Sequence, residues 1–164
     1  MNVPAPAAHQ HQRLLNELEQ FARSATQRDA LMQRLSDRLH AEMARYNWVG
    51  FYLVDRVEAE VLLLGPFTGS FTPHERIAFS EGLCGEAASS GHTVVVNDVS
   101  IDAHYLQGSG QTKSEMVAPI LAARKLVGVL DVNSYFAGTF GNADRQFVEA
   151  CAALVGKFFE RPAG

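Results

Sequence analysis

The sequence lacks most of the features that mark specialised classes of protein. Its 164 residues include only two cysteines, too few for the disulfide framework of a small secreted domain. The formal charge is −4 rather than positive, which argues against a nucleic-acid-binding protein. No apolar run approaches the ~20 residues of a membrane-spanning helix, and the start has no signal-peptide pattern. We therefore expect a cytoplasmic protein that contacts neither nucleic acid nor membrane.

The length and the spacing of apolar residues predict one domain with helices at both ends. Residues 1–8 are expected to form a disordered tail, and residues 9–164 a single domain. Helical periodicity predicts two helices between residues 9 and 46, with Thr26 as the N-cap of the second. A last helix is predicted over residues 144–159.

Between these helices the apolar period changes from 3.6 to 2, which indicates β-strands. A short helix over residues 83–90, closed by Gly91, and an irregular loop over residues 100–112 interrupt them. Short connections favour antiparallel pairing. The order of elements predicts an α+β fold with helices packed on an antiparallel sheet. The expected strands are residues 48–54, 61–64, 76–79, 93–96, 115–121 and 126–133.

Cys84 is the first candidate for chemistry. It lies in the run Gly82-Leu83-Cys84-Gly85, at the start of the short helix, a position that suits a redox-active thiol. A thiol redox cycle usually needs a second thiol. The other cysteine, Cys151, falls on the apolar face of the last predicted helix, where we expect it to be buried core.

Three polar residues occupy strand positions that are normally apolar: Glu115, Asp131 and Asn133. Trp48 and Tyr52 share one face of an earlier strand and can add an aromatic wall. Acids beside aromatic rings suit a small ligand that carries an amine. The alternative is that the two acids end their strands in solvent, and the pattern leaves both interpretations open. No histidine has metal-ligand spacing, so no metal site is predicted.

Six short motifs follow one another along the chain. They are Asn47-Trp48-Val49-Gly50-Phe51-Tyr52, Leu64-Gly65-Pro66-Phe67, Gly82-Leu83-Cys84-Gly85-Glu86-Ala87-Ala88, Asp98-Val99, Ser114-Glu115-Met116-Val117-Ala118-Pro119 and Gly128-Val129-Leu130-Asp131-Val132-Asn133. In this order they resemble the free methionine-(R)-sulfoxide reductases, which are single-domain members of the GAF fold. The resemblance implies a GAF-like, PAS-related central antiparallel sheet of about six strands with flanking helices, usually in a homodimer.

The resemblance also implies roles for individual residues. In that family a loop cysteine attacks the sulfoxide sulfur, and a second cysteine resolves the sulfenic acid as a disulfide that thioredoxin reduces. Cys84 stands at the resolving position, whereas the attacking position is Gly108. The family's substrate contacts are matched by Trp48, Tyr52 and Glu115, and its two-aspartate motif is replaced by Asp131 and Asn133.

Glycine has no side chain with which to attack sulfur. We therefore expect a sensor-like GAF domain that binds a small molecule, such as methionine or its sulfoxide, without catalysis and without a cofactor. One alternative is a reductase that uses Cys84 as its redox thiol, with thioredoxin or another external thiol as reductant. Another is a dimerisation scaffold. Binding of a cyclic nucleotide is a further alternative, which is based only on analogy with other GAF domains and therefore on the fold alone.

Overall fold

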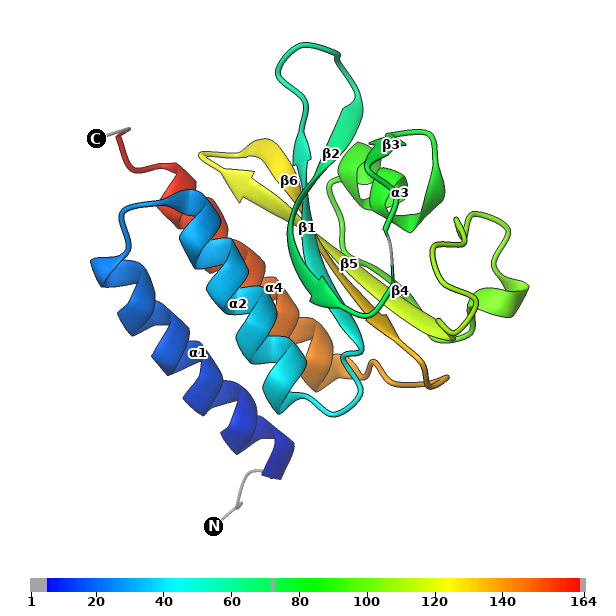
Figure 1. Ribbon diagram of the computed structural model, residues 1–164, viewed down its shortest axis with the longest axis horizontal. Helices are drawn as coiled ribbons and strands as arrows, with labels where there is room; N and C mark the ends of the chain where they lie inside the picture. Colours follow the sequence, from blue (N-terminus) through cyan, green and yellow to red (C-terminus); the bar gives the residue numbers. More distant parts are fainter. Residues whose placement is uncertain (1–5, 72, 163–164) are drawn as a thin grey trace.

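The computed structural model describes residues 6–71 and 73–162, and its helices pack around a central sheet (Figure 1). The elements in chain order are α1 (Pro6–Ser24), α2 (Arg28–Glu42), β1 (Trp48–Val54), β2 (Val61–Gly69), β3 (Arg76–Ala78), α3 (Gly82–Ser90), β4 (Val94–Val96), the 3-10 helix η1 (Val99–Ile101), β5 (Ser114–Ala122), β6 (Lys125–Ser134) and α4 (Asn142–Phe159).

The six strands form one sheet in the order β3-β2-β1-β6-β5-β4. Every pair of neighbours is antiparallel. Helices α1, α2 and α4 cover one face, and α3 lies on the other (Figure 1). The predicted α+β fold and the six antiparallel strands are confirmed.

Side-chain alternation along the strands builds a separate apolar core on each face of the sheet. On β1, Val49 and Phe51 point toward α1, α2 and α4, whereas Trp48 and Tyr52 point toward α3. Cys151 is completely buried in the larger core, as its place in the helical pattern predicted. The smaller core on the α3 face holds the polar residues described below.

Several predicted boundaries differ from those of the structure, among them the end of β2 and the starts of α1 and α2. Strand β2 does not end before Gly65 but continues to Gly69. Gly50 and Tyr52 of β1 pair with Phe67 and Leu64 of β2, so β2 carries one extra residue at this point, in the manner of a β-bulge. Helix α1 begins at Pro6, so part of the predicted tail is helical, while residues 1–5 lie outside the described residues. Helix α2 begins one residue later than predicted, with Gln27 rather than Thr26 at the N-cap.

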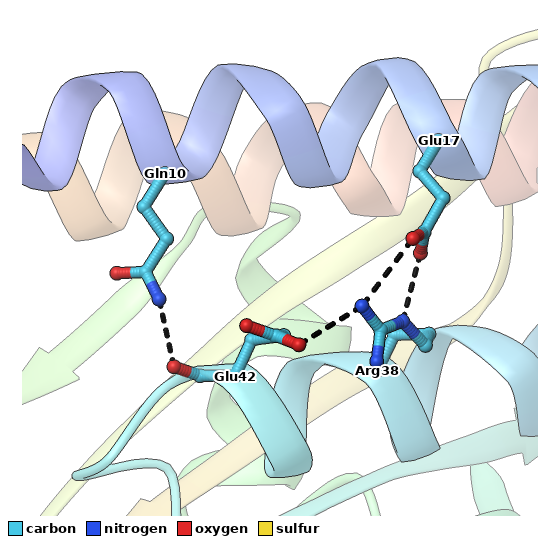
Figure 2. Close-up of polar contacts among 4 residues, drawn as sticks. All are labelled: Gln10, Glu17, Arg38 and Glu42. Atoms are coloured by element: carbon cyan, nitrogen blue, oxygen red, sulfur yellow. Dashed lines mark hydrogen bonds and ion pairs between the residues drawn. The ribbon is translucent and has the colours of Figure 1, made fainter.

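Polar contacts join α1 to α2 along their solvent side (Figure 2). Arg38 donates from Nε to Glu17 Oε2 over 2.8 Å and from its terminal nitrogen to Glu42 Oε1 over 3.0 Å. Gln10 Nε2 donates to the backbone oxygen of Glu42 over 2.8 Å. Exposed pairs of this kind contribute roughly 0.2–1 kcal/mol each, so they orient α1 more than they stabilise the fold.

Among the described residues, none of the helices has both the length and the apolar character needed to span a bilayer.

Candidate ligand-binding site

A small pocket opens on the α3 face of the sheet, between the strands, the first turn of α3 and two loops. All seven positions that the sequence singled out contribute to its wall. They come from β1, α3, the loop before β5, and the strands β5 and β6, and they are Trp48, Tyr52, Cys84, Gly108, Glu115, Asp131 and Asn133. The antiparallel pairing of β1 with β6 and of β6 with β5 places these side chains together.

Two glycines make room for the indole of Trp48. A Cβ atom at Gly50 or at Gly69 would lie closer to the Trp48 ring than van der Waals contact permits. On its other sides the indole stacks against Phe67 and Phe71, with ring centroids 5.5 and 5.3 Å away. Trp48 is completely buried, so it forms a fixed aromatic wall.

Glu115 and Asp131 are buried, with exposed fractions of 6% and 5%. The interpretation that they end their strands in solvent is therefore wrong. Burial, and then the charge of Asp131, raises the pKa of Glu115 well above its ordinary range, and burial raises the pKa of Asp131. Ionising both of two adjacent buried carboxyl groups costs a large free energy, because each charge is poorly solvated and repels the other. The pair therefore retains a proton at pH values where exposed carboxyl groups have lost theirs.

Asn133 connects this acid pair to the loop before β5. Its side-chain nitrogen donates to Asp131 Oδ1 over 3.2 Å, and its oxygen accepts from Thr112 Oγ1 over 3.2 Å. Asn133 thus keeps the hydrogen bonds that fix Asp131 without adding a third negative charge to the site.

The thiol of Cys84 meets the same two acids. Its sulfur and one oxygen from each of Glu115 and Asp131 all lie within 4.8 Å of one another. Cys84 is in the first turn of α3, but burial, followed by the charges of the two acids, raises its pKa well above the ordinary value. In the unliganded pocket these effects favour the protonated thiol over the reactive thiolate.

The same three atoms offer a thiolate and two carboxylates to a borderline cation such as Zn²⁺. No pattern in the sequence indicated this grouping, because the three residues are far apart along the chain and come together only where α3 packs on the sheet. The described residues therefore contain one group with the spacing of metal ligands, whereas the absence of a metal site stays a prediction.

Two loops complete the pocket, and the sequence did not predict the contribution of Phe71 and His74 from the first of them. His74 Nε2 and the backbone oxygen of Gln107 are 2.9 Å apart, and Tyr52 donates its hydroxyl proton to the backbone oxygen of His74 over 2.9 Å. A Cβ atom at Gly108 would lie 3.3 Å from Phe71 Cε2. The aromatic ring of Phe71 therefore faces the position at which the resemblance places an attacking cysteine.

The GAF domain model matches residues 27–157. The chain is 38% identical to the free methionine-R-sulfoxide reductase of Saccharomyces cerevisiae over 68% of its own length and 62% of that protein. It is 30% identical to the Escherichia coli free methionine-R-sulfoxide reductase over 78% of this chain and 75% of that protein. The solved structure of the Neisseria meningitidis free methionine-R-sulfoxide reductase with its substrate superposes with a TM-score of 0.89 at 31% identity, covering 98% and 94% of the two chains. The chain therefore belongs to the GAF domain family, within which it is homologous to the free methionine-R-sulfoxide reductases.

Proposed function

We propose that this GAF domain binds a small, amino-acid-like molecule in the α3-side pocket and does not reduce it. One observation carries the proposal. The pocket keeps a buried acid pair and an aromatic wall, yet the position of the family's attacking thiol is Gly108. A site that retains its recognition groups and lacks the nucleophile is suited to binding rather than turnover.

The chemistry of the pocket favours a ligand that carries an ammonium group, such as free methionine or free methionine sulfoxide. A cation placed beside Glu115 and Asp131 would favour their ionised forms, so that binding releases a proton to the solvent. The relative from N. meningitidis is described in complex with its substrate. Its similarity to this chain supports the same class of ligand here.

Isothermal titration calorimetry with L-methionine-(R)-sulfoxide, L-methionine and a panel of other amino acids tests the binding. We expect saturable binding of at least one sulfur amino acid in the presence of EDTA, with loss of affinity in Glu115→Gln. Glu86→Gln, which changes an exposed acid on α3, is the matched control and should bind as the wild type does. A wild type that binds no member of the panel would contradict the proposal and favour a dimerisation scaffold.

A second candidate function, reduction of the sulfoxide by Cys84, is favoured by the contact of its sulfur with the two acids. The Cys84 sulfur would attack the sulfoxide sulfur, and the oxygen would pass to Cys84 as a sulfenic acid while methionine leaves. A protonated carboxyl group can supply a proton to that oxygen. Two equivalents of an external thiol would then return Cys84 to the thiol and release water and a disulfide.

Methionine release, measured with dithiothreitol as the external thiol, separates the two candidates. Under the binding proposal the wild type gives no turnover above the level of Cys84→Ser. Gly108→Cys serves as the positive control, since the site can accommodate a Cβ atom at that position after a small shift of Phe71. Turnover by the wild type that Cys84→Ser abolishes would establish the reductase instead.

Two further properties are part of the proposal. We expect the protein in the cytoplasm, where a reducing environment keeps Cys84 as a thiol. We also expect a homodimer, as the resemblance implies. Light scattering on the purified protein measures the mass directly, and the mass of a single chain would contradict that expectation.

A further inference from the structure

The side chains that the proposed function uses are closed off from solvent. Each of them is at most 6% exposed: Trp48, Tyr52, Cys84, Glu115, Asp131 and Asn133. The cavity that they line measures about 30 Å³. This is room for about one or two water molecules, whereas pockets for small molecules usually measure about 300 Å³ or more. A ligand therefore reaches these groups only after part of the pocket wall has moved.

The loop between η1 and β5 is a part of the wall that is loosely attached. Leu106 and Gly108 of this loop line the pocket, and each of residues 103–111 is exposed or half-buried. Between described residues, a single hydrogen bond joins this stretch to a distant segment of the chain, from His74 Nε2 to the backbone oxygen of Gln107 over 2.9 Å. The loop can therefore leave the pocket by breaking one long-range hydrogen bond.

His74, in contrast, is fixed to the sheet. Its backbone oxygen accepts the hydroxyl proton of Tyr52, a residue of β1, over 2.9 Å. The backbone oxygen of the next residue, Glu75, accepts from the backbone nitrogen of Leu64 in β2 over 3.0 Å. Because a carbonyl oxygen only accepts hydrogen bonds, His74 Nε2 carries the proton in its contact with Gln107. The contact thus joins a firmly attached segment of the pocket wall to a loosely attached one.

We propose that residues 103–111 form a lid over the pocket and that His74 is the latch that holds the lid closed. The ends of the lid are fixed, since Asp102 donates its backbone N–H to Val99 and the buried Thr112 donates to Asn133. Breaking the bond between His74 and Gln107 then lets the loop turn about these ends and uncovers the pocket. The inference rests on the proposed function for the ligand that the lid admits, whereas the opening itself is measured without ligand.

Alkylation of the two cysteines by iodoacetamide, followed by mass spectrometry of the peptides, measures the opening. Cys84 lines the pocket, so its rate reports the population with an open lid. Cys151 is completely buried in the larger core and reports unfolding of the whole domain. We expect His74→Ala to accelerate alkylation of Cys84 about fivefold, the usual effect of losing one hydrogen bond, and to leave the rate of Cys151 unchanged. His74→Gln keeps an N–H donor for the same oxygen and should stay within about twofold of the wild type.

His104→Ala is the matched control, because His104 is an exposed histidine of the same loop outside the pocket wall; both thiols should react as they do in the wild type. An unchanged rate of Cys84 in His74→Ala would overturn the inference. Equal acceleration of both cysteines would show a general loss of stability and would overturn it as well. Equal rates in His74→Ala and His74→Gln would assign the effect to packing of the ring, and the latch would be wrong.

Stopped-flow fluorescence of Trp48 adds a measurement with ligand, using L-methionine and L-methionine-(R)-sulfoxide as probes. Association should be faster in His74→Ala by a factor similar to that of the alkylation, because the ligand enters through the open form. Faster alkylation with unchanged association would show that the ligand does not enter beneath the lid, which contradicts the inference. A wild type that binds neither probe would refute the proposed function, and the alkylation rates would still decide whether the lid and its latch exist.

Discussion

At the scale of single residues, the wall of the pocket depends on side chains that are absent. The indole of Trp48 on β1 can lie over Gly69, its pairing partner on β2, because Gly69 has no Cβ atom. We expect Gly69→Ala to displace the indole, to lower the free energy of unfolding by about 1–3 kcal/mol, and to weaken ligand binding. Urea unfolding measures the stability, and tryptophan fluorescence measures the displacement because Trp48 is the single tryptophan of the chain. Calorimetry measures the loss of ligand affinity.

The control for that substitution is Gly110→Ala. Its Cβ atom would meet nothing closer than 3.8 Å, and no unusual backbone angle is required there. A Gly69→Ala variant as stable as Gly110→Ala would show that the sheet opens readily to accept a Cβ atom. The close packing of the indole would then have no role in shaping the site.

Glu115 gives the unliganded protein a characteristic dependence of stability on pH. Its pKa is higher in the folded protein than in the unfolded chain. The folded state therefore binds more protons between those two pKa values, and stability falls as the pH rises through that range. Glutamine does not titrate, so Glu115→Gln does not lose stability in this way. We therefore expect the free energy of unfolding of the variant to be higher than that of the wild type at alkaline pH by on the order of 1 kcal/mol. The difference should become smaller toward acid pH.

Urea unfolding of the unliganded protein at a series of pH values from about 5 to 8.5 measures this difference. Glu86→Gln, at an exposed position on α3, should follow the wild-type curve. Parallel curves for Glu115→Gln and the wild type would mean that Glu115 is ionised equally in the folded and unfolded states. The retained proton of the acid pair would then be disproved.

At the scale of secondary-structure elements, boundaries depended on contacts between strands. The run from Trp48 to Val54 has aromatic and β-branched residues throughout, and β1 begins and ends where the pattern predicted. Pro66 indicated a break because proline cannot donate to a sheet ladder. In the structure β2 passes through Pro66 at an irregularity in its pairing with β1, which is a property of the strand pair that no single strand sequence encodes.

The docking of α1 against α4 should also respond to pH. The His11 ring stacks on Phe147 at 4.3 Å, and its Nε2 atom is 3.8 Å from Asp144 Oδ1. Burial lowers the pKa of His11, and the charge of Asp144 only partly opposes this effect. The unfolded chain therefore binds more protons just below the ordinary histidine pKa, and stability falls on acidification through that range.

We expect His11→Phe, which keeps the stacked ring, to remove this acid sensitivity. Between about pH 7.5 and pH 5.5 the wild type should lose up to about 1 kcal/mol more stability than the variant. Hydrogen exchange of the α1 amides over the same pH range localises the effect. A wild type that becomes more stable than His11→Phe on acidification would show that the ion pair with Asp144 outweighs burial.

At the scale of the whole molecule, the sheet lies between a larger core that stabilises the fold and a smaller core that includes the pocket. The larger core, beneath α1, α2 and α4, contains no residue of the pocket wall, whereas the smaller core on the α3 face contains Trp48, Tyr52 and Cys84. Leu35→Ala, at a completely buried position of the larger core, should lower the free energy of unfolding by about 2–5 kcal/mol.

The same variant should bind ligand with an affinity within about twofold of the wild type, since distant sites usually act independently. Calorimetry well below the melting temperature checks this expectation. A large change in affinity would indicate that the two faces of the sheet are coupled. The assignment of stability to one core and of ligand binding to the other would then be wrong.

The sequence by itself determined which segments form the α-helices and the strands, which face of a strand each residue occupies, and the absence of a thiol at position 108, because alternation and composition are local properties. Only the tertiary structure decided that Glu115 and Asp131 are buried rather than solvated, and that they raise the pKa of Cys84. Burial and electrostatic coupling depend on what packs against a strand from elsewhere in the chain. For the same reason Phe71 and His74, which lie in a connection without periodicity, became part of the site only in the folded protein.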